Sequence, residues 1–201
     1  MKTYSKHPFE EFIPKNATKL IIGTIPPARF CFDKNGKQGE LELCDVNFYY
    51  GSRDNDFWPL NSKATGWEFT CDRNAVKSRE DFLQSNSLGI MDMIEECERK
   101  KSSALDKDLT VKKRKDLGRI LLENPSINTL IYTSEFVKNQ VNIELSTYHH
   151  SLPNEVKKKK MCFGKPYDVT ILYSPSPTAL RGLGVGGDQI RLDQYKSVFK
   201  K

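Results

Sequence analysis

One stretch of the sequence, residues 48–59, combines residue types that a packed core rarely brings together. It reads FYYGSRDNDFWP, so five aromatic residues flank a short turn that carries one Arg, two Asp and one Asn. Aromatic rings can stack on a planar ligand, and a short amide such as Asn55 holds a donor and an acceptor in fixed positions. The Gly-Ser-Arg-Asp-Asn run has the composition of a turn. We interpret the stretch as a pocket for a flat, polar molecule, and an aromatic mini-core beneath a loop is the alternative.

Two other loops follow short apolar runs that are typical of buried strands. The run at 20–22 is stopped by residues 23–27 (Gly-Thr-Ile-Pro-Pro), and the run at 168–173 leads into residues 174–182, which contain two prolines. In open α/β sheets, ligands bind outside the carboxyl ends of the parallel strands. Both loops are therefore placed where a ligand would sit.

The elements between these loops alternate between strand and helix. In chain order, we expect a helix from Ser78, a helix over 117–122 that ends at Asn124, a buried strand over 127–133 and a helix capped by Ser134. The chain closes with an amphipathic helix in which Leu192, Tyr195 and Phe199 share one face. This rhythm is that of βαβ units and predicts the α/β class, with a central, mostly parallel sheet.

Four features allow more than one interpretation. Residues 28–47 contain an Asp-Lys-Asn-Gly-Lys turn and suggest a hairpin-like insertion, while 61–77 suggest an irregular excursion or a second small insertion. The cationic run at 100–115 is interpreted as a solvated helical face, with phosphate contact as the alternative. Asp92 caps the local backbone or binds a ligand, and capping is the commoner role of such a residue.

Composition excludes several classes of protein. The 201 residues fit one domain, and five cysteines without a C-x-x-C spacing argue against a disulfide framework, a zinc ribbon or an iron-sulfur cluster. The first residues have no apolar signal region, and no apolar run approaches the ~18 residues of a membrane span, so a cytoplasmic protein is expected. A net charge of +6 suits a polyanionic partner but favours nucleic acid only weakly.

Common cofactor motifs are also missing from the sequence. The glycines at 182–187 do not follow a strand as G-x-G-x-x-G, and no G-x-x-x-x-G-K-[ST] loop is present. His149 and His150 are adjacent, so they point different ways on a helix or a strand and form no metal site without distant partners. We expect neither a cofactor nor a metal.

Taken together, the loops resemble the uracil-DNA glycosylase superfamily. The closest likeness is to the branch of hypoxanthine-DNA glycosylases and mismatch-type uracil glycosylases, which carry a G-S-x-P-G loop, a Y-Y…N-x-F-W segment and a late S-x-S-P loop. Here the second piece stands at Tyr49-Tyr50 and 55–58, and residues 89–106 look like that branch's G-x-x-D-V-I…C…R…S-L-D run. The first loop departs from the branch, and residues 28–47 and 61–87 look longer than its connections.

The resemblance implies a three-layer α/β/α sandwich and a monofunctional glycosylase of base-excision repair. Such an enzyme flips a deaminated or damaged base, of the uracil or hypoxanthine type, out of duplex DNA and hydrolyses its N-glycosidic bond. Asn55 would be the catalytic amide, with Asp54 and Asp56 as rivals. The base pocket would be formed by Gly23, Thr24, Ile25, Pro26, Tyr49, Tyr50 and Phe57. The DNA-binding residues would be Ser174, Ser176, Pro177, Thr178, Leu180 and Arg181.

Other functions remain compatible with these residues. A catalytically inactive module of the same fold that binds nucleic acid or a nucleobase is the main alternative. A small-molecule hydrolase acting on nucleosides is a further one. The glycosylase would act as a monomer on duplex DNA that holds a damaged or mismatched base, without a membrane.

Overall fold

A six-stranded sheet forms the centre of the protein. The computed structural model describes residues 2–146, 155–156, 159–162 and 165–200. The strand order is β3-β2-β6-β9-β8-β7, of which the first four strands are parallel and the last two are added antiparallel. The strands are β2 (Lys19–Gly23), β3 (Leu88–Asp92), β6 (Thr129–Tyr132), β7 (Glu155–Val156), β8 (Lys159–Cys162) and β9 (Lys165–Ile171).

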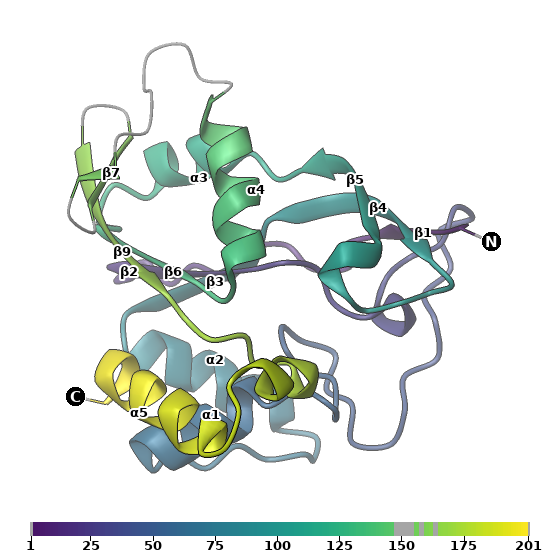
Figure 1. Cartoon of the computed structure of the whole chain (residues 1–201), viewed down its shortest axis with the longest axis horizontal. Coiled ribbons are helices and arrows are strands. Elements are labelled where there is room, and N and C mark those ends of the chain that lie inside the picture. The colour runs from purple at the N-terminus through teal and green to yellow at the C-terminus, as the bar shows by residue number, and fades with distance from the viewer. Residues whose placement is uncertain (1, 147–154, 157–158, 163–164, 201) are drawn as a thin grey trace.

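Helices cover both faces of this sheet and give three layers (Figure 1). The helices on one face are α1 (Phe57–Thr65), α2 (Ala75–Ser85) and α5 (Gly187–Phe199), and those on the other are α3 (Leu117–Glu123) and α4 (Glu135–Ser146). Along β2, Ile21 joins the first core while Leu20 and Ile22 join the second. Burial on both faces explains why the three central positions of the strand, Leu20, Ile21 and Ile22, are all apolar. The predicted three-layer α/β/α sandwich is confirmed.

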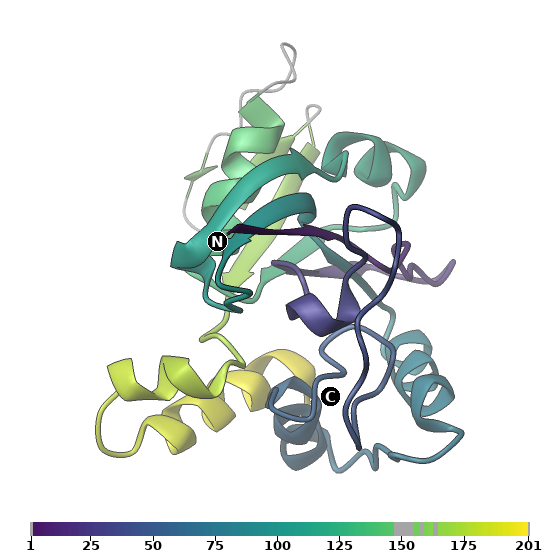
Figure 2. The ribbon, with the colours of Figure 1, turned by 90° about the vertical axis from the view of Figure 1, so that its right-hand side faces the viewer.

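A second, smaller sheet stands beside the first. It contains β1 (Lys2–Lys6), β4 (Ile94–Lys100) and β5 (Leu109–Arg114), paired antiparallel in the order β1-β4-β5. Only Met93 separates the end of β3 from the start of β4, so the chain passes directly from one sheet to the other. Figure 2 views the molecule from the side of this small sheet. Short 3-10 turns lie at Ala28–Phe30, Asp106–Asp108 and Pro177–Gly182.

Most of the expected strands and helices are confirmed. The three apolar runs form β2, β6 and β9, and the helix that ends before Asn124 is α3. Ser134 caps α4, because its Oγ accepts the Val137 N–H at 3.2 Å. Tyr195 and Phe199 are buried on one side of α5, as the amphipathic pattern predicts.

The helical interpretation of 100–115 is wrong. Residues 109–114 form β5, and their charges pair across the strands: Lys113 with Glu95 at 2.9 Å and Lys112 with Glu98 at 3.4 Å. Opposite charges that face each other on neighbouring strands stabilise a sheet, and opposite charges at i and i+4 stabilise a helix. A run of mixed charges therefore does not distinguish a strand from a helix.

Other boundaries also differ from the expectations. Helix α2 begins at Ala75 rather than Ser78, whose hydroxyl donates instead to the Ala75 carbonyl at 3.2 Å. The 61–77 segment is not wholly irregular, because α1 continues to Thr65. In 28–47, the hairpin-like feature is one isolated bridge between Phe32 and Gln38 around the predicted turn.

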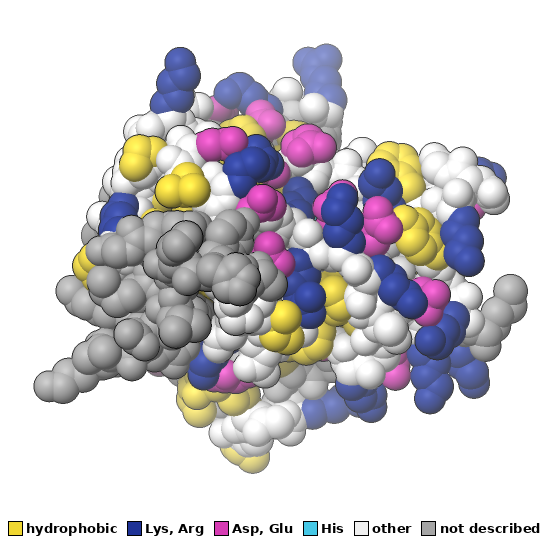
Figure 3. Space-filling view, turned by 90° about the horizontal axis from the view of Figure 1, so that it is seen from above, with side chains coloured by type: hydrophobic (Ala, Val, Ile, Leu, Met, Phe, Trp, Pro, Cys, Tyr) yellow, Lys and Arg dark blue, Asp and Glu magenta, His cyan; other side chains and the backbone are white. Residues whose placement is uncertain are grey.

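The surface on the side of α3 and α4 carries charges of both signs. Seen from the side of α3 and α4, Lys and Arg side chains are interspersed with Asp and Glu side chains (Figure 3). The net positive charge therefore does not mark this face as a single basic patch. In the described part of the chain, no helix combines the length and the apolar character needed to cross a membrane. His149 and His150 lie outside the described residues.

Candidate functional site

A cavity of about 480 Å³ lies at the carboxyl ends of the four parallel strands. This volume is in the range of small-molecule sites. The four strand ends contribute Thr24–Pro27 after β2, Asp92 at the end of β3, Thr133 and Ser134 after β6, and Ser174–Ala179 after β9. Three further segments complete the lining: Arg29 and Phe30, Tyr50–Ser52 with Asp54 and Asn55, and Ala104–Asp106. The three loops that the sequence singled out are thus brought to one place.

The floor of the cavity is closely packed around Gly23. A Cβ atom on this residue would lie 2.0 Å from Asp92 Oδ1 and 2.3 Å from the Tyr50 hydroxyl oxygen. Only glycine lets both side chains approach the end of β2 this closely. The absence of a side chain at Gly23 therefore allows this packing, and Gly23 itself does not line the cavity.

Asp92 is held at the floor by a residue from the N-terminal strand segment. Its Oδ2 lies 2.9 Å from Nε2 of His7, and Asp92 is 4% exposed. Nδ1 of His7 lies 2.9 Å from the Phe9 carbonyl oxygen and 3.0 Å from the Phe9 nitrogen, so both ring nitrogens are engaged and the ring is fixed with Nε2 facing Asp92. The capping interpretation of Asp92 is wrong, since this side chain binds His7 and faces the cavity.

Tyr50 forms one wall and is fixed at both its ring and its hydroxyl. Its ring stacks on Phe57 with centroids 4.3 Å apart, and its hydroxyl donates to Thr133 Oγ1 at 2.9 Å. Burial raises the pKa of this phenol well above 10, and the nearby Asp92 adds to the shift, so the hydroxyl remains a donor. Phe57 is fully buried behind Tyr50 and does not line the cavity.

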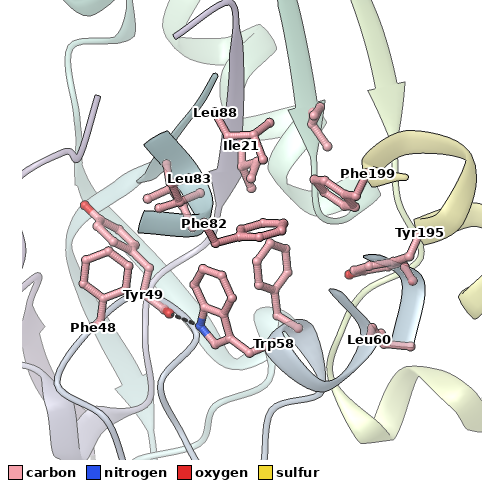
Figure 4. Close-up of a cluster of buried hydrophobic side chains, with 14 of the residues drawn as sticks. Ile21, Phe48, Tyr49, Trp58, Leu60, Phe82, Leu83, Leu88, Tyr195 and Phe199 are labelled. Carbon is pink, nitrogen blue, oxygen red and sulfur yellow. Dashed lines mark hydrogen bonds between the residues drawn. The ribbon is translucent and has the colours of Figure 1, made fainter. Parts of the chain in front are cut away.

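Tyr49 belongs to the core and not to the pocket. It is 1% exposed, its hydroxyl donates to the Glu10 carbonyl at 2.8 Å, and its own carbonyl accepts the Trp58 indole N–H at 2.8 Å (Figure 4). The predicted contact of Tyr49 with the ligand is therefore corrected. The two interpretations of the 48–59 stretch both hold, for different residues: Phe48, Tyr49, Phe57 and Trp58 build a core, and Tyr50 and Asn55 line the cavity.

Asn55 lies at the rim, at the start of α1. Its Oδ1 accepts the Phe57 N–H at 2.9 Å, which fixes the plane of the amide. The oxygen keeps one lone pair, and Nδ2 has no hydrogen-bond partner among the described residues. The side chain can therefore offer both an acceptor and a donor to a molecule in the cavity.

The two aspartates beside Asn55 have different partners. Asp56 forms an ion pair with Arg191 of α5 at 2.7 Å, and the Arg191 side chain is 3% exposed. The Asp56 N–H also donates to the Pro175 carbonyl at 3.0 Å, so Asp56 ties α1 to the late loop. Asp54 is mostly exposed and lies 3.3 Å from Arg29. Asp56 is thus engaged in structure, and Asp54 lines the cavity beside Asn55.

An ion pair between Arg29 and Asp45 stabilises the cavity wall that lies between the floor and the rim. Arg29 donates to both carboxylate oxygens of Asp45, at 2.6 and 2.9 Å, and to Ser52 Oγ at 2.8 Å. Burial raises the pKa of Asp45, but the hydrogen bonds from Arg29 and from the backbone of Arg53 and Glu42 outweigh it and lower the pKa to about 2. This network fixes the turn that carries Asn55.

The late loop lies over the other side of the rim. Ser174, Ser176, Pro177 and Thr178 line the cavity, and Ser176 Oγ and Thr178 Oγ1 are 2.8 Å apart. Leu180 and Arg181 lie further along the same 3-10 turn, outside the cavity lining, and Arg181 is exposed. Of the residues predicted for the site, Gly23, Tyr49, Phe57, Leu180 and Arg181 are those that do not line the cavity.

Several lining or supporting residues were not expected from the sequence. His7 reaches the site from 85 residues away in sequence, and no local pattern marks it. Asp106 lies in the S-A-L-D piece of the family resemblance, which is the one signal that pointed to it. Within the described residues, no three His, Cys, Asp or Glu side chains are grouped so as to hold a metal ion.

The architecture and the position of the cavity define the class: an α/β/α sandwich with a site at the carboxyl ends of its parallel strands. No family model and no curated protein matches this chain. Among solved structures, it is similar to the solution NMR structure of a "putative Uracil DNA glycosylase" from Methanosarcina acetivorans. The TM-score is 0.62 over 99% of this chain and 97% of that chain, with 19% sequence identity. At this identity the likeness establishes the fold.

Proposed function

We propose that the protein is a monofunctional DNA glycosylase that removes a deaminated or damaged base of the uracil or hypoxanthine type. The observation that carries this proposal is the cavity itself, which joins an aromatic wall, an amide and a Ser/Pro-rich loop from three separate parts of the chain. Base excision needs these parts, because the base must be stacked, its bond to the sugar broken and the strand held open. The structural likeness to a protein described as such a glycosylase supports the same function.

Tyr50 supplies the surface for the base. Phe57 covers one face of its ring, and the ring lines the cavity. Stacking on an aromatic side chain is worth about 1–3 kcal/mol per base and tolerates different bases. The hydrogen bond from Tyr50 to Thr133 keeps this surface in place before a base enters.

Asn55 acts on the sugar side. An amide has no proton-accepting capacity at neutral pH, so Asn55 positions the attacking water and stabilises the oxocarbenium-like sugar without deprotonating anything. Its Oδ1 is aligned by the Phe57 N–H and retains one lone pair for the water.

The late loop meets the DNA strand. Ser174 and Ser176 are suited to contact a phosphate, and the exposed Pro177, with Leu180 or Arg181, is suited to fill the gap left by the flipped nucleotide. The bond from Asp56 to Pro175 keeps this loop at a fixed distance from Asn55.

Excision assays test the proposal directly. Duplexes that contain uracil, hypoxanthine, xanthine or thymine opposite guanine are incubated with the protein, and alkaline strand scission reports abasic sites. We expect product on at least one of the uracil or hypoxanthine duplexes. No abasic site on any duplex would remove the enzyme, and salt-dependent DNA affinity without product would identify a binding module of the same fold.

The role of Asn55 is tested on the duplex that is cleaved. Asn55→Ala is expected to lower the single-turnover rate by about 10²–10³-fold, the usual effect of removing one preorganised polar group. Asn74→Ala, at an exposed position before α2 that makes no side-chain cap bond, is the matched control and keeps the wild-type rate. If Asn55→Ala is as fast as wild type while Asp54→Asn is not, the catalytic role passes to Asp54.

A further inference from the structure

The cavity has two chemically different ends. Asn55 and the late loop stand at its rim, where the Asp56 N–H binds Pro175. The opposite end is the floor, where Asp92 packs against Gly23. A base whose sugar lies beside Asn55 therefore directs its far edge toward the floor.

Asp106 belongs to the floor. It lies on the connection between β4 and β5 and lines the cavity beside Thr24, whose side chain lowers its pKa. The charge of Asp106 raises the pKa of the Tyr50 phenol, and the charge of Asp92 raises the pKa of Asp106. Asp106 is thus a carboxyl group at the end of the cavity where the departing base lies.

A buried arginine holds Asp106 in this place. Arg99 is 1% exposed and donates to the carbonyls of Pro26 and Ser103, which lie in the loops that carry Thr24 and Asp106. The Leu105 N–H also donates to Ser103 Oγ at 3.1 Å, and the Asp108 N–H to the Leu105 carbonyl at 3.0 Å. The Asp106 carboxyl therefore faces Thr24 from a short, braced turn.

The surroundings of Asp106 raise its pKa above the ordinary value of an aspartate. Burial raises its pKa and the charge of Asp92 adds to this, while the hydrogen bond from Thr24 and the positive charge of Arg99 act in the opposite direction. The net shift is upward. A bound base removes further water from the floor and pushes the pKa in the same direction.

We propose that Asp106 is a second catalytic group, which protonates the departing base. This inference rests on the proposed glycosylase function. As the bond between C1′ and the base nitrogen breaks, its electron pair goes to the base, and the Asp106 carboxyl gives its proton to a nitrogen or carbonyl oxygen of that base. The water held at Asn55 adds to C1′ and releases a proton to solvent, from which Asp106 is protonated again.

A leaving-group comparison tests the proposal. Uracil and 5-fluorouracil have nearly the same shape, but 5-fluorouracil leaves more easily and needs less help from an acid. Asp106→Asn keeps the size of the side chain and cannot transfer a proton. We expect it to lower single-turnover excision of uracil by about 10²-fold or more, the usual effect of losing a general acid, and that of 5-fluorouracil by about tenfold or less.

Two further measurements distinguish a role of Asp106 in proton transfer from a role in structure. The wild-type rate should fall as pH rises through the pKa of Asp106 in the complex, because the acid loses its proton, and Asp106→Asn should lack this decline. Where the panel gives hypoxanthine as the substrate, 7-deazahypoxanthine removes one acceptor atom, so wild type should slow toward the rate of Asp106→Asn. Asp108→Asn, on the same turn but outside the cavity lining, is the matched control and should keep rate and pH profile.

The possible failures are distinguishable. Equal losses on both bases, an unchanged pH profile or a wild-type rate in Asp106→Asn overturn the acid role, while a continued dependence on Asn55 keeps the glycosylase. A lower Tm in Asp106→Asn with equal losses on both bases assigns the residue to structure. A wild-type protein that excises no base overturns the function and this inference together.

Discussion

The floor and the rim of the cavity are built in different ways. At the floor, Gly23, Asp92 and Tyr50 pack so closely that one additional methyl group would overlap two of them. At the rim, Pro177 and Thr178 are exposed at the start of a short 3-10 turn, which continues beyond the cavity lining to the exposed Arg181. The comparison teaches that substitutions at the floor disturb folding and ligand binding together, whereas those at the rim act on the ligand alone.

Gly23→Ala should be the most damaging change. The new Cβ would meet Asp92 Oδ1 and the Tyr50 hydroxyl, which are held by His7 and Thr133 and have little freedom to move. We expect a loss of about 3 kcal/mol in the free energy of unfolding, at the upper end of overpacking costs. Urea unfolding followed by circular dichroism measures it.

Gly182→Ala, at the far end of the 3-10 turn that begins at the rim, is the matched control. A Cβ at this position meets no atom within 4 Å, so stability should change by less than about 0.5 kcal/mol. Equal losses for the two alanines would contradict the distinction between floor and rim.

The Arg29–Asp45 pair joins the two regions and should make stability pH-dependent. Because the pKa of Asp45 is lowered from 3.8 to about 2 in the folded protein, its contribution is present above pH 4 and lost as pH falls toward 2. The shift corresponds to about 2 kcal/mol. Asp45→Asn should be less stable than wild type by this amount at pH 6, and the difference should shrink at pH 2.5 in urea titrations. A constant difference at both values would argue against the pair.

Tyr50→Phe should cost less. It removes one hydrogen bond, to Thr133, while the stacked ring remains, so we expect a loss of about 1 kcal/mol. Tyr49→Phe loses the comparable bond to Glu10 and serves as the control. Both should have a similar Tm, but only Tyr50→Phe should weaken binding of substrate DNA. A parallel effect of Tyr49→Phe on binding would return Tyr49 to the site.

Arg181→Ala should leave stability unchanged. The side chain is exposed, so its removal affects only a DNA strand near the late loop. An arginine placed in the gap of the strand also neutralises about one phosphate charge, so its loss should reduce the salt slope of DNA affinity by about 1. Arg73→Ala, also exposed but on the segment before α2 and not on the late loop, should keep the wild-type slope. An unaltered slope in Arg181→Ala would place the DNA elsewhere.

The sequence predicted the strands and the loops that end them because burial on both faces leaves a clear apolar signal. It did not separate Tyr49 from Tyr50. Tyr50 has a φ of +54°, which turns its side chain out of the alternation that neighbouring residues otherwise follow, and Gly51 completes the tight turn. The local composition does not indicate this change of direction. Only the structure therefore shows that Tyr49 lies in the core and Tyr50 in the cavity lining.

Long-range contacts were the other limit. Asp92 ends a strand of the large sheet, and its partner His7 follows the first strand of the small one. Asp106 enters the cavity only because β4 and β5 form a hairpin. The turn and the second strand of that hairpin, within residues 100–115, were interpreted as a helix, since cross-strand ion pairs and helical ion pairs leave similar charge patterns. Because this segment was interpreted as a helix and not as a hairpin, the position of Asp106 at its turn was not recognised.

The N-terminal strand has a practical importance that its peripheral position conceals. Lys2–Lys6 pair with β4 along their whole length, and His7 follows at once to hold Asp92. A fusion partner or a trimmed start at this end would act on the ligand cavity as directly as a substitution inside it. Tags for purification and labels for spectroscopy belong at the opposite terminus, after α5.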